Sequence, residues 1–180
     1  LKETLIRGQY QGYQDEKGVP PYSNTETYLA LKTYINNKRW KDVPFYIRTG
    51  KMLKEKKTEI RIKFRKPNIL YPPQMIGNNL LVFKIQPEEG VYLEFNAKKP
   101  GQENLIIPVK MDFCQNCDIG INTPEAYERL IFDILKGEQS LFARWDEVRA
   151  SWNFVDHLLN NWENDLHIYQ PQTNGPKVKI

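Results

Sequence analysis

Cysteine and histidine are both scarce in this sequence of 180 residues, which holds two of each. A zinc site needs four ligands, and a thioredoxin-type redox pair needs a strand that runs into a helix. Cys114 and Cys117 are close enough for either role, but His157 and His167 lie far along the chain and no such helix is evident. We therefore expect two thiols in a turn, no metal site and a reducing compartment.

Long apolar runs and a dinucleotide-binding signature are also absent. No segment approaches the roughly 20 apolar residues that cross a bilayer, and no secretory leader is expected at the start. Membranes are accordingly not expected among the partners. No Gly-x-Gly-x-x-Gly follows any expected strand, so we do not expect the βαβ unit that holds a nicotinamide coenzyme. The content of 40% apolar and 12% aromatic residues nevertheless indicates a folded domain rather than disorder.

Positive charge is concentrated in one segment, residues 48–66. This segment holds nine basic residues against Glu55 and Glu59, a local net of +7, while the whole chain carries only +4. Such a concentration indicates an anionic ligand rather than general solubility. Lys51 follows a glycine, at which the backbone can turn sharply, and a turn there would bring Lys51 and Lys56 to one compact dianion.

Alternating apolar and polar residues predict a predominantly antiparallel sheet. The clearest strand is 58–65, with Ile60, Ile62 and Phe64 on a face expected in the core and charged residues on the other face. Short connections are typical of antiparallel pairing. The other expected strands are 1–10, 28–35, 43–47, 79–86, 91–96 and 105–113.

Two amphipathic helices are expected late in the chain. The first carries apolar residues at helical spacing from Tyr127 to Leu135, after Thr123 as cap and Pro124 as first residue, and stops at Gly137. A single turn of helix is expected over 37–42.

The second helix, over 146–162, should carry Val148, Trp152, Val155, Leu159 and Trp162 on one face. These residues would cover the sheet. The sequence thus predicts an α+β domain, with a predominantly antiparallel sheet covered on one face by helices. An extended surface segment should follow over 167–180.

A series of short motifs runs along most of the chain. They are Arg7-Gly-Gln-Tyr10, Asn24-Thr-Glu-Thr-Tyr28, Asn37-Lys-Arg-Trp40, Val43-Pro-Phe-Tyr-Ile-Arg48, Arg48-Thr-Gly-Lys51, Ile85-Gln-Pro87, Pro124-Glu-Ala-Tyr-Glu-Arg-Leu130 and Asn174-Gly-Pro176. Together and in this order, they resemble the C-terminal domain of the glucose-6-phosphate dehydrogenase family. The resemblance implies that Lys51 and Lys56 contact the phosphate of glucose 6-phosphate, with Gln86 as a further substrate contact.

Some members of that family hold a second, structural NADP in this domain. The resemblance places Arg48, Lys57, Arg61 and Lys84 at basic positions that line this site, although Lys84 replaces an arginine. Arginine suits the 2′-phosphate because its planar fork binds phosphate oxygens bidentately. The main NADP would bind through an N-terminal coenzyme domain that this sequence does not contain.

The resemblance also implies what the whole protein does and what this part lacks. The family oxidises glucose 6-phosphate to 6-phosphogluconolactone in the oxidative pentose phosphate pathway, in the cytoplasm, as a dimer or tetramer formed through the sheet. Its catalytic histidine lies in an Arg-Ile-Asp-His-Tyr type motif, which this sequence does not contain. The pair Asp156-His157 does not match that motif, since its neighbours differ and it falls inside the second expected helix. We therefore expect no catalytic residue in this chain, and no activity from it alone.

Two other functions stay open from the residues themselves. A polyanion-binding module would use the charged face of strand 58–65, with Lys63 and Arg65, to follow nucleic-acid phosphates. We expect no exposed aromatic residues interleaved with these cations for base stacking, so nucleic acid is not an expected partner. A purely structural dimerisation module would bind no ligand, and apolar strands are compatible with that function too.

Overall fold

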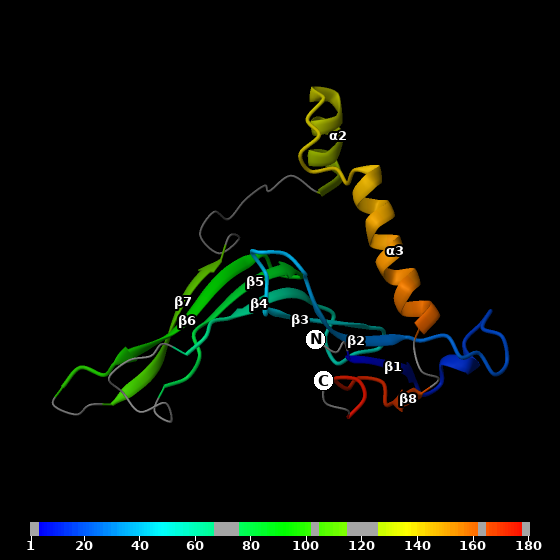
Figure 1. The fold of residues 1–180 in the computed structure, drawn as a ribbon, viewed down its shortest axis with the longest axis horizontal. Helices are drawn as coiled ribbons and strands as arrows, with labels where there is room; N and C mark the ends of the chain where they lie inside the picture. The colour runs from blue at the N-terminus through cyan, green and yellow to red at the C-terminus, as the bar shows by residue number, and fades with distance from the viewer. Residues whose placement is uncertain (1–3, 67–75, 102–104, 115–125, 162–164, 178–180) are drawn as a thin grey trace. The chain divides into compact units, whose positions relative to one another are not determined.

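The computed structural model describes residues 4–66, 76–101, 105–114, 126–161 and 165–177, and contains both strands and α-helices (Figure 1). The α+β class and the mainly antiparallel pairing are confirmed. The strands form two four-stranded sheets. The chain divides into two compact units, Leu1–Glu55 with Glu138–Ile180, and Lys56–Gly137.

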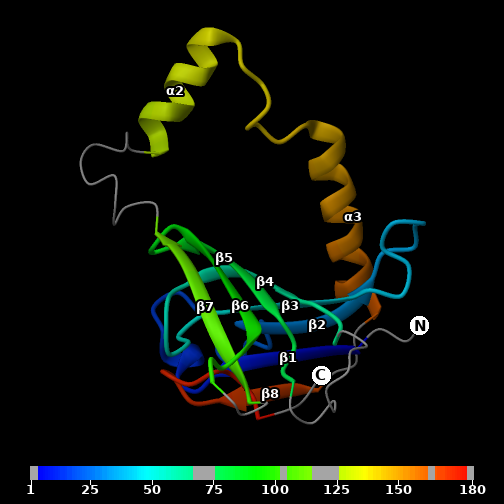
Figure 2. The ribbon, with the colours of Figure 1, turned by 90° about the vertical axis from the view of Figure 1, so that its left-hand side faces the viewer.

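The first unit is built on a sheet with the strand order β3-β2-β1-β8 (Figure 2). The first three of these strands pair antiparallel, while β8, from near the C-terminus, lies parallel beside β1. Their bounds, with those of the short 3-10 helix η1, are β1 Thr4–Tyr10, η1 Tyr13–Asp15, β2 Tyr28–Tyr34, β3 Pro44–Gly50 and β8 Leu166–Tyr169.

Strand β8 overturns the expectation of an extended surface segment at the C-terminus. Tyr169, its last residue, is 4% exposed and belongs to the core cluster of this unit. The strand is only four residues long and pairs with β1, which lies far away in the sequence, so local composition does not predict it. The core cluster consists of Ile6, Tyr10, Tyr28, Ala30 and Tyr169.

Helix α3, Trp145–Asn161, belongs to this unit, and residues of its C-terminal half line a cavity together with residues of β2 and β3. Leu158 is 8% exposed, whereas Trp152 is 61% exposed. The expectation that Trp152 covers the sheet is therefore wrong. A 17-residue helix is about 25 Å long, and Figure 1 shows that only one end of α3 lies beside β2.

The described part of the second unit holds a fully antiparallel sheet and one helix. The sheet has the order β4-β5-β6-β7, and the chain turns tightly between β5 and β6, where Lys84 pairs with Gly90, as predicted. The bounds are β4 Thr58–Lys63, β5 Leu80–Gln86, β6 Gly90–Lys98, β7 Ile106–Cys114 and α2 Ala126–Lys136. Gly137 follows α2 at a φ of 71° and ends the helix as predicted.

One face of this second sheet is apolar on all four strands. Ile60 lies opposite Phe83, and the same face continues through Val91 of β6 to Phe113 of β7. The alternation predicted for β4 is thus confirmed, but its burial is not, because Ile60 is 55% exposed and Phe113 is 58% exposed. A sheet face is buried only where a second layer packs on it, and no described element of this unit does so.

Helix α2 does not cover that face either. Most of its apolar side chains are exposed, including Tyr127 at 78%, Phe132 at 53% and Leu135 at 80%.

The turn of helix expected over 37–42 is instead a pair of turns, in which Asn37 Oδ1 accepts a hydrogen bond from Trp40 N and Asp42 takes a left-handed φ of 63°. No helix in the described part of the chain combines the length and apolarity needed to cross a membrane.

Some predictions fall on residues that the structure does not describe. Cys117, Thr123, Pro124 and Trp162 lie outside the described residues, and only the backbone of Cys114 is described. The predicted roles of these residues stay predictions.

Candidate functional site

Lys51 lies directly after β3, in a loop whose backbone is fixed from two sides. Its amide donates a hydrogen bond to the carbonyl oxygen of Thr27 at 2.8 Å. Its carbonyl oxygen accepts a hydrogen bond from the Tyr169 hydroxyl at 2.7 Å. The side chain itself is exposed. The loop therefore presents one lysine ammonium to solvent from a backbone that cannot easily shift.

The C-terminal segment holds the rest of this loop. The Gln172 amide donates to the carbonyl oxygen of Met52 at 2.8 Å, and the Lys54 amide donates to the carbonyl oxygen of Thr173 at 2.9 Å. Met52 adopts a left-handed φ of 50°, which turns the chain sharply just after Lys51. The sharp turn expected beside the glycine is thus present, one residue past Lys51.

Two glycines of the sequence motifs make room for the Tyr28 ring. A Cβ at Gly50 would lie 2.8 Å from Tyr28 Cδ2, and a Cβ at Gly175 would lie 2.4 Å from Tyr28 Cε2. Real Cβ atoms do not come so close to other heavy atoms. The glycines of the Arg48-Thr-Gly-Lys51 and Asn174-Gly-Pro176 motifs are therefore required by the same buried ring.

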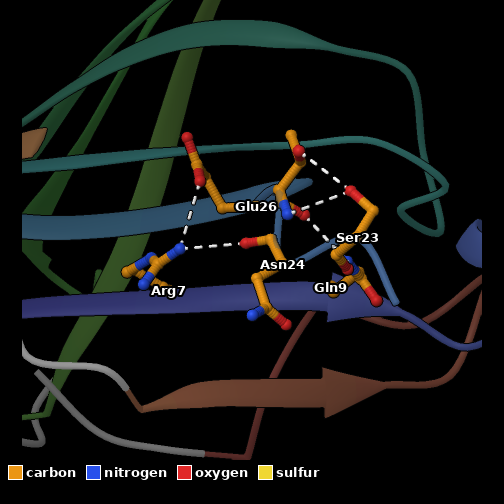
Figure 3. Close-up of polar contacts among 6 residues, drawn as sticks. Arg7, Gln9, Ser23, Asn24 and Glu26 are labelled. Atoms are coloured by element: carbon orange, nitrogen blue, oxygen red, sulfur yellow. Dashed lines mark hydrogen bonds and ion pairs between the residues drawn. The ribbon is translucent and has the colours of Figure 1, made fainter. Parts of the chain in front are cut away.

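The two motifs nearest the N-terminus are joined to each other by hydrogen bonds and an ion pair (Figure 3). Arg7, on β1, donates to the carbonyl oxygen of Asn24 at 3.0 Å and pairs with Glu26 at 3.4 Å. Gln9 donates from its amide to the carbonyl oxygens of Ser23 at 2.8 Å and of residue 25 at 2.9 Å. These bonds hold the segment that ends in Thr27, which in turn binds the Lys51 amide.

An apolar cavity of about 460 Å³ opens beside Lys51, within the first unit. Leu31 and Ile47 of the sheet line it together with Leu158 of α3, and Lys51 and Glu26 contribute charge. An apolar lining does not recognise a phosphate, so an anion bound here would have to contact the lysine ammonium. Arg48 lies one residue before the Thr49 that lines the cavity, and it pairs with buried Ala30 across β2 and β3.

Burial keeps the tyrosines under the loop in their neutral form. Burial raises the pKa of Tyr28, although the nearby Arg48 guanidinium lowers it in part. Burial also raises the pKa of Tyr169 and outweighs the lowering effect of its hydrogen bond to Thr27. At neutral pH the Tyr169 hydroxyl therefore keeps the proton that it donates to Lys51.

The other expected phosphate and cofactor residues belong to the second unit. Lys56 is exposed, and the Gln86 amide donates to Thr58 Oγ1 at 2.8 Å across β4 and β5. The three cations expected to line a second NADP site in this unit each lie near a carboxylate. Lys57 and Arg61 lie 4.0 and 3.7 Å from Glu59, and Lys84 lies 3.9 Å from Glu88.

The structure thus gathers Lys57 and Arg61 around one carboxylate, while Arg48 belongs to the other unit. A nucleotide phosphate would have to replace Glu59 as their partner. On α3, Asp156 and His157 are both exposed, which agrees with the interpretation that they form part of a helix surface.

Comparison with known proteins matches this chain to one family over its whole length. The family model described as glucose-6-phosphate dehydrogenase, C-terminal domain, covers residues 1–179. This chain belongs to that family. A glucose-6-phosphate 1-dehydrogenase from Bacillus subtilis is 46% identical over 98% of this chain and 40% of the relative, and one from Dictyostelium discoideum is 42% identical over 94% of this chain and 35% of the relative.

Solved structures of glucose-6-phosphate dehydrogenases share the fold. One, described as a glucose-6-phosphate dehydrogenase in complex with its substrate glucose-6-phosphate, superimposes with a TM-score of 0.85 at 36% identity, over 96% of this chain and 38% of that one. The enzyme from Mycobacterium avium gives a TM-score of 0.77 at 33% identity, over 96% of this chain and 37% of that one. The chain therefore spans about two fifths of the length of these dehydrogenases.

Several residues of this glucose-6-phosphate dehydrogenase domain support the Lys51 loop in a way that the sequence did not predict. Thr27 and Tyr169 hold the Lys51 backbone, but neither residue type nor spacing distinguishes them from ordinary core residues. Arg7 and Gln9 carried a signal, because polar side chains on an otherwise apolar strand are buried only with hydrogen-bond partners.

Proposed function

We propose that this chain is the substrate-binding and oligomerisation domain of an NADP-dependent glucose-6-phosphate 1-dehydrogenase of the oxidative pentose phosphate pathway. The family match over residues 1–179 carries the proposal. The whole protein would oxidise glucose 6-phosphate to 6-phosphogluconolactone with NADP⁺ as hydride acceptor. This chain alone would be inactive, because the catalytic histidine and the main coenzyme site would lie in the rest of the protein.

Lys51 and Lys56 would anchor the phosphate of the substrate, and Gln86 would contact the sugar phosphate as well. The Lys51 side chain is exposed, and its backbone is held by two hydrogen bonds. This supports the role, since a prepositioned cation loses little freedom on binding. Anchoring the phosphate, a group that does not react, fixes the position of the reacting carbon. Lys56 follows five residues later, at the start of the second unit.

The test is the Michaelis constant for glucose 6-phosphate in the complete dehydrogenase. Lys51→Ala should raise it about 10-fold or more, because a hydrogen bond to a charged group contributes about 1.5–3 kcal/mol. Lys54→Ala is the matched control, since Lys54 is an exposed lysine of the same loop and the substitution removes the same charge. Equal Michaelis constants for the two variants would remove Lys51 from the substrate site.

A structural NADP bound by Arg48, Lys57, Arg61 and Lys84 is a second part of the proposal. The grouping of Lys57 and Arg61 within 4.0 Å of Glu59 supports a local cation pair that could accept a phosphate in place of the carboxylate. NADP, but not NAD, should then raise the melting temperature of the chain. Equal shifts for both dinucleotides, or none, would argue against the site.

Assembly would use the apolar face of the second sheet, with a second copy of the chain as partner. Exposed side chains on this face include Ile62 at 42% and Met111 at 62%. A contiguous apolar face of this kind on a folded protein marks an interaction surface. A dimer or tetramer formed there would bury it.

We propose a cytoplasmic location for the protein. A relative from Solanum tuberosum, named as a cytoplasmic isoform of glucose-6-phosphate 1-dehydrogenase, supports this location.

A further inference from the structure

The hydroxyl of Tyr169 makes an unusual set of contacts for a core tyrosine. The ring is buried with Tyr28 and Tyr10, at centroid distances of 5.6 and 6.3 Å. The hydroxyl oxygen lies 2.7 Å from the carbonyl oxygen of Lys51 and 3.2 Å from that of Thr27. A hydroxyl has one proton to donate, and Lys51 is the nearer acceptor.

The hydroxyl of Thr27 completes the set. Thr27 Oγ1 lies 3.1 Å from the Tyr169 hydroxyl and accepts a hydrogen bond from the Tyr10 amide at 3.0 Å. Because the Tyr169 proton is directed to Lys51, Thr27 Oγ1 is the donor between the two hydroxyls. The donors then run in one direction, from the Tyr10 amide through Thr27 and Tyr169 to the carbonyl oxygen of Lys51. Hydrogen bonds aligned in this way strengthen one another.

Thr27 also fixes the amide side of Lys51. The Lys51 amide donates to the carbonyl oxygen of Thr27 at 2.8 Å, and the Thr27 amide donates to the carbonyl oxygen of Gly8 at 2.8 Å. Lys51, Thr27 and Tyr169 therefore form a closed ring of hydrogen bonds. This ring joins the residue before β2, the residue after β3 and the last residue of β8, so that the direction in which Lys51 leaves β3 depends on a strand residue 118 positions further along the chain.

We propose that Tyr169 is a positioning residue for substrate binding, which acts by orienting the Lys51 backbone through its hydroxyl. The inference rests on the proposed role of Lys51 as a phosphate anchor. Tyr169 does not reach the substrate in this proposal. Its hydroxyl fixes the lysine in the loop, and the aromatic ring serves the core independently of that bond. Removing the oxygen alone should therefore weaken binding of the sugar phosphate and leave the chemical step unchanged.

The experiment is a double-mutant cycle in the complete dehydrogenase, with the variants Tyr169→Phe, Lys51→Ala and both together. Tyr169→Phe should raise the Michaelis constant for glucose 6-phosphate about three- to tenfold, the range expected for one lost hydrogen bond, with kcat changed less than twofold. In the Lys51→Ala background the same change should have no further effect on the Michaelis constant.

Tyr10→Phe is the control for a general loss of stability. Tyr10 lies in the same core cluster, but its hydroxyl donates to Glu16 and not to the Lys51 loop. This variant should leave the Michaelis constant unchanged. If Tyr169→Phe fails to fold, Thr27→Val removes the hydroxyl that donates to Tyr169 and provides the same cycle.

The outcomes separate this inference from the proposed function. If Lys51→Ala leaves the Michaelis constant unchanged, the proposed role of Lys51 is wrong. If Lys51→Ala raises it, but Tyr169→Phe has the same effect with and without Lys51, the function stands and the positioning role is overturned. An equal rise in Tyr10→Phe would overturn it as well, because a structural defect of the core would then explain both.

Discussion

Gly175 provides the sharpest test of how the sequence motifs meet around Tyr28. Its φ of 92° lies in the left-handed region, and a Cβ there would approach the Tyr28 ring to 2.4 Å. Gly175→Ala therefore adds two costs. A left-handed backbone costs an L residue about 1–2 kcal/mol, and overpacking a filled core costs about 1–3 kcal/mol more. The free energy of unfolding should fall by about 2–5 kcal/mol in total.

Gly18 separates the two costs. Its φ of 89° is nearly the same, but no atom lies within 4 Å of a Cβ built there. Gly18→Ala should therefore show the backbone cost alone. Urea denaturation of the purified chain, followed by circular dichroism, measures both variants. The extra loss in Gly175→Ala should also disappear when Tyr28 is changed to Leu, which removes the ring. Equal losses for Gly175→Ala and Gly18→Ala would refute the close approach of these segments.

Three further predictions concern pH, nucleotide binding and assembly. The hydrogen bond from Tyr10 to Glu16, together with burial, raises the pKa of Tyr10 from 10.0 to about 12. Because the unfolded chain loses this proton first, the stabilisation is complete below pH 10.0 and is lost as the pH rises towards about 12, and Tyr10→Phe should flatten this part of the stability profile. Glu59→Gln removes the carboxylate beside Lys57 and Arg61, so it should raise the affinity for NADP several-fold in a thermal-shift titration; weaker binding would contradict the proposed cation pair. Met111→Lys places a charge on the apolar sheet face and should raise the dissociation constant of the dimer at least 10-fold in analytical ultracentrifugation, whereas Lys110→Gln, on the opposite face, should not; equal effects would exclude this face as the interface.

The sequence predicted best those elements whose pattern is local. Ile60 and Ile62 alternate with Arg61 and Lys63, and this alternation is that of β4 in the structure. Helix α2 ends where Gly137 predicts. In both cases the signal lies within a dozen residues and depends on backbone geometry alone.

Long-range contacts and burial could not be predicted in the same way. Tyr169 lies in the largely polar, proline- and glycine-containing segment 167–180, which resembles a surface tail, yet it is buried in the core cluster beside β1. Conversely, the apolar face around Ile60 has the pattern of a core but is exposed, because burial depends on a partner layer that the alternation does not specify.

The candidate site shows the same division. The charge excess and the glycine before Lys51 are local features, and they are the sequence signals for this loop; its role in substrate binding stays a prediction. The residues that hold the loop, Thr27 and Tyr169, are distant from it in the sequence and are chemically ordinary. They fix the Lys51 backbone through hydrogen bonds that depend on the fold, and no local sequence pattern predicts such bonds.

The most direct test of the central claim compares glucose 6-phosphate with unphosphorylated glucose as substrates of the complete dehydrogenase. If Lys51 recognises the phosphate, Lys51→Ala should lower kcat/KM for glucose 6-phosphate about 10- to 100-fold. It should leave kcat/KM for glucose unchanged, and Lys54→Ala should affect neither. An equal loss for both substrates, or a loss for neither, would contradict the claim that this domain supplies phosphate recognition through Lys51.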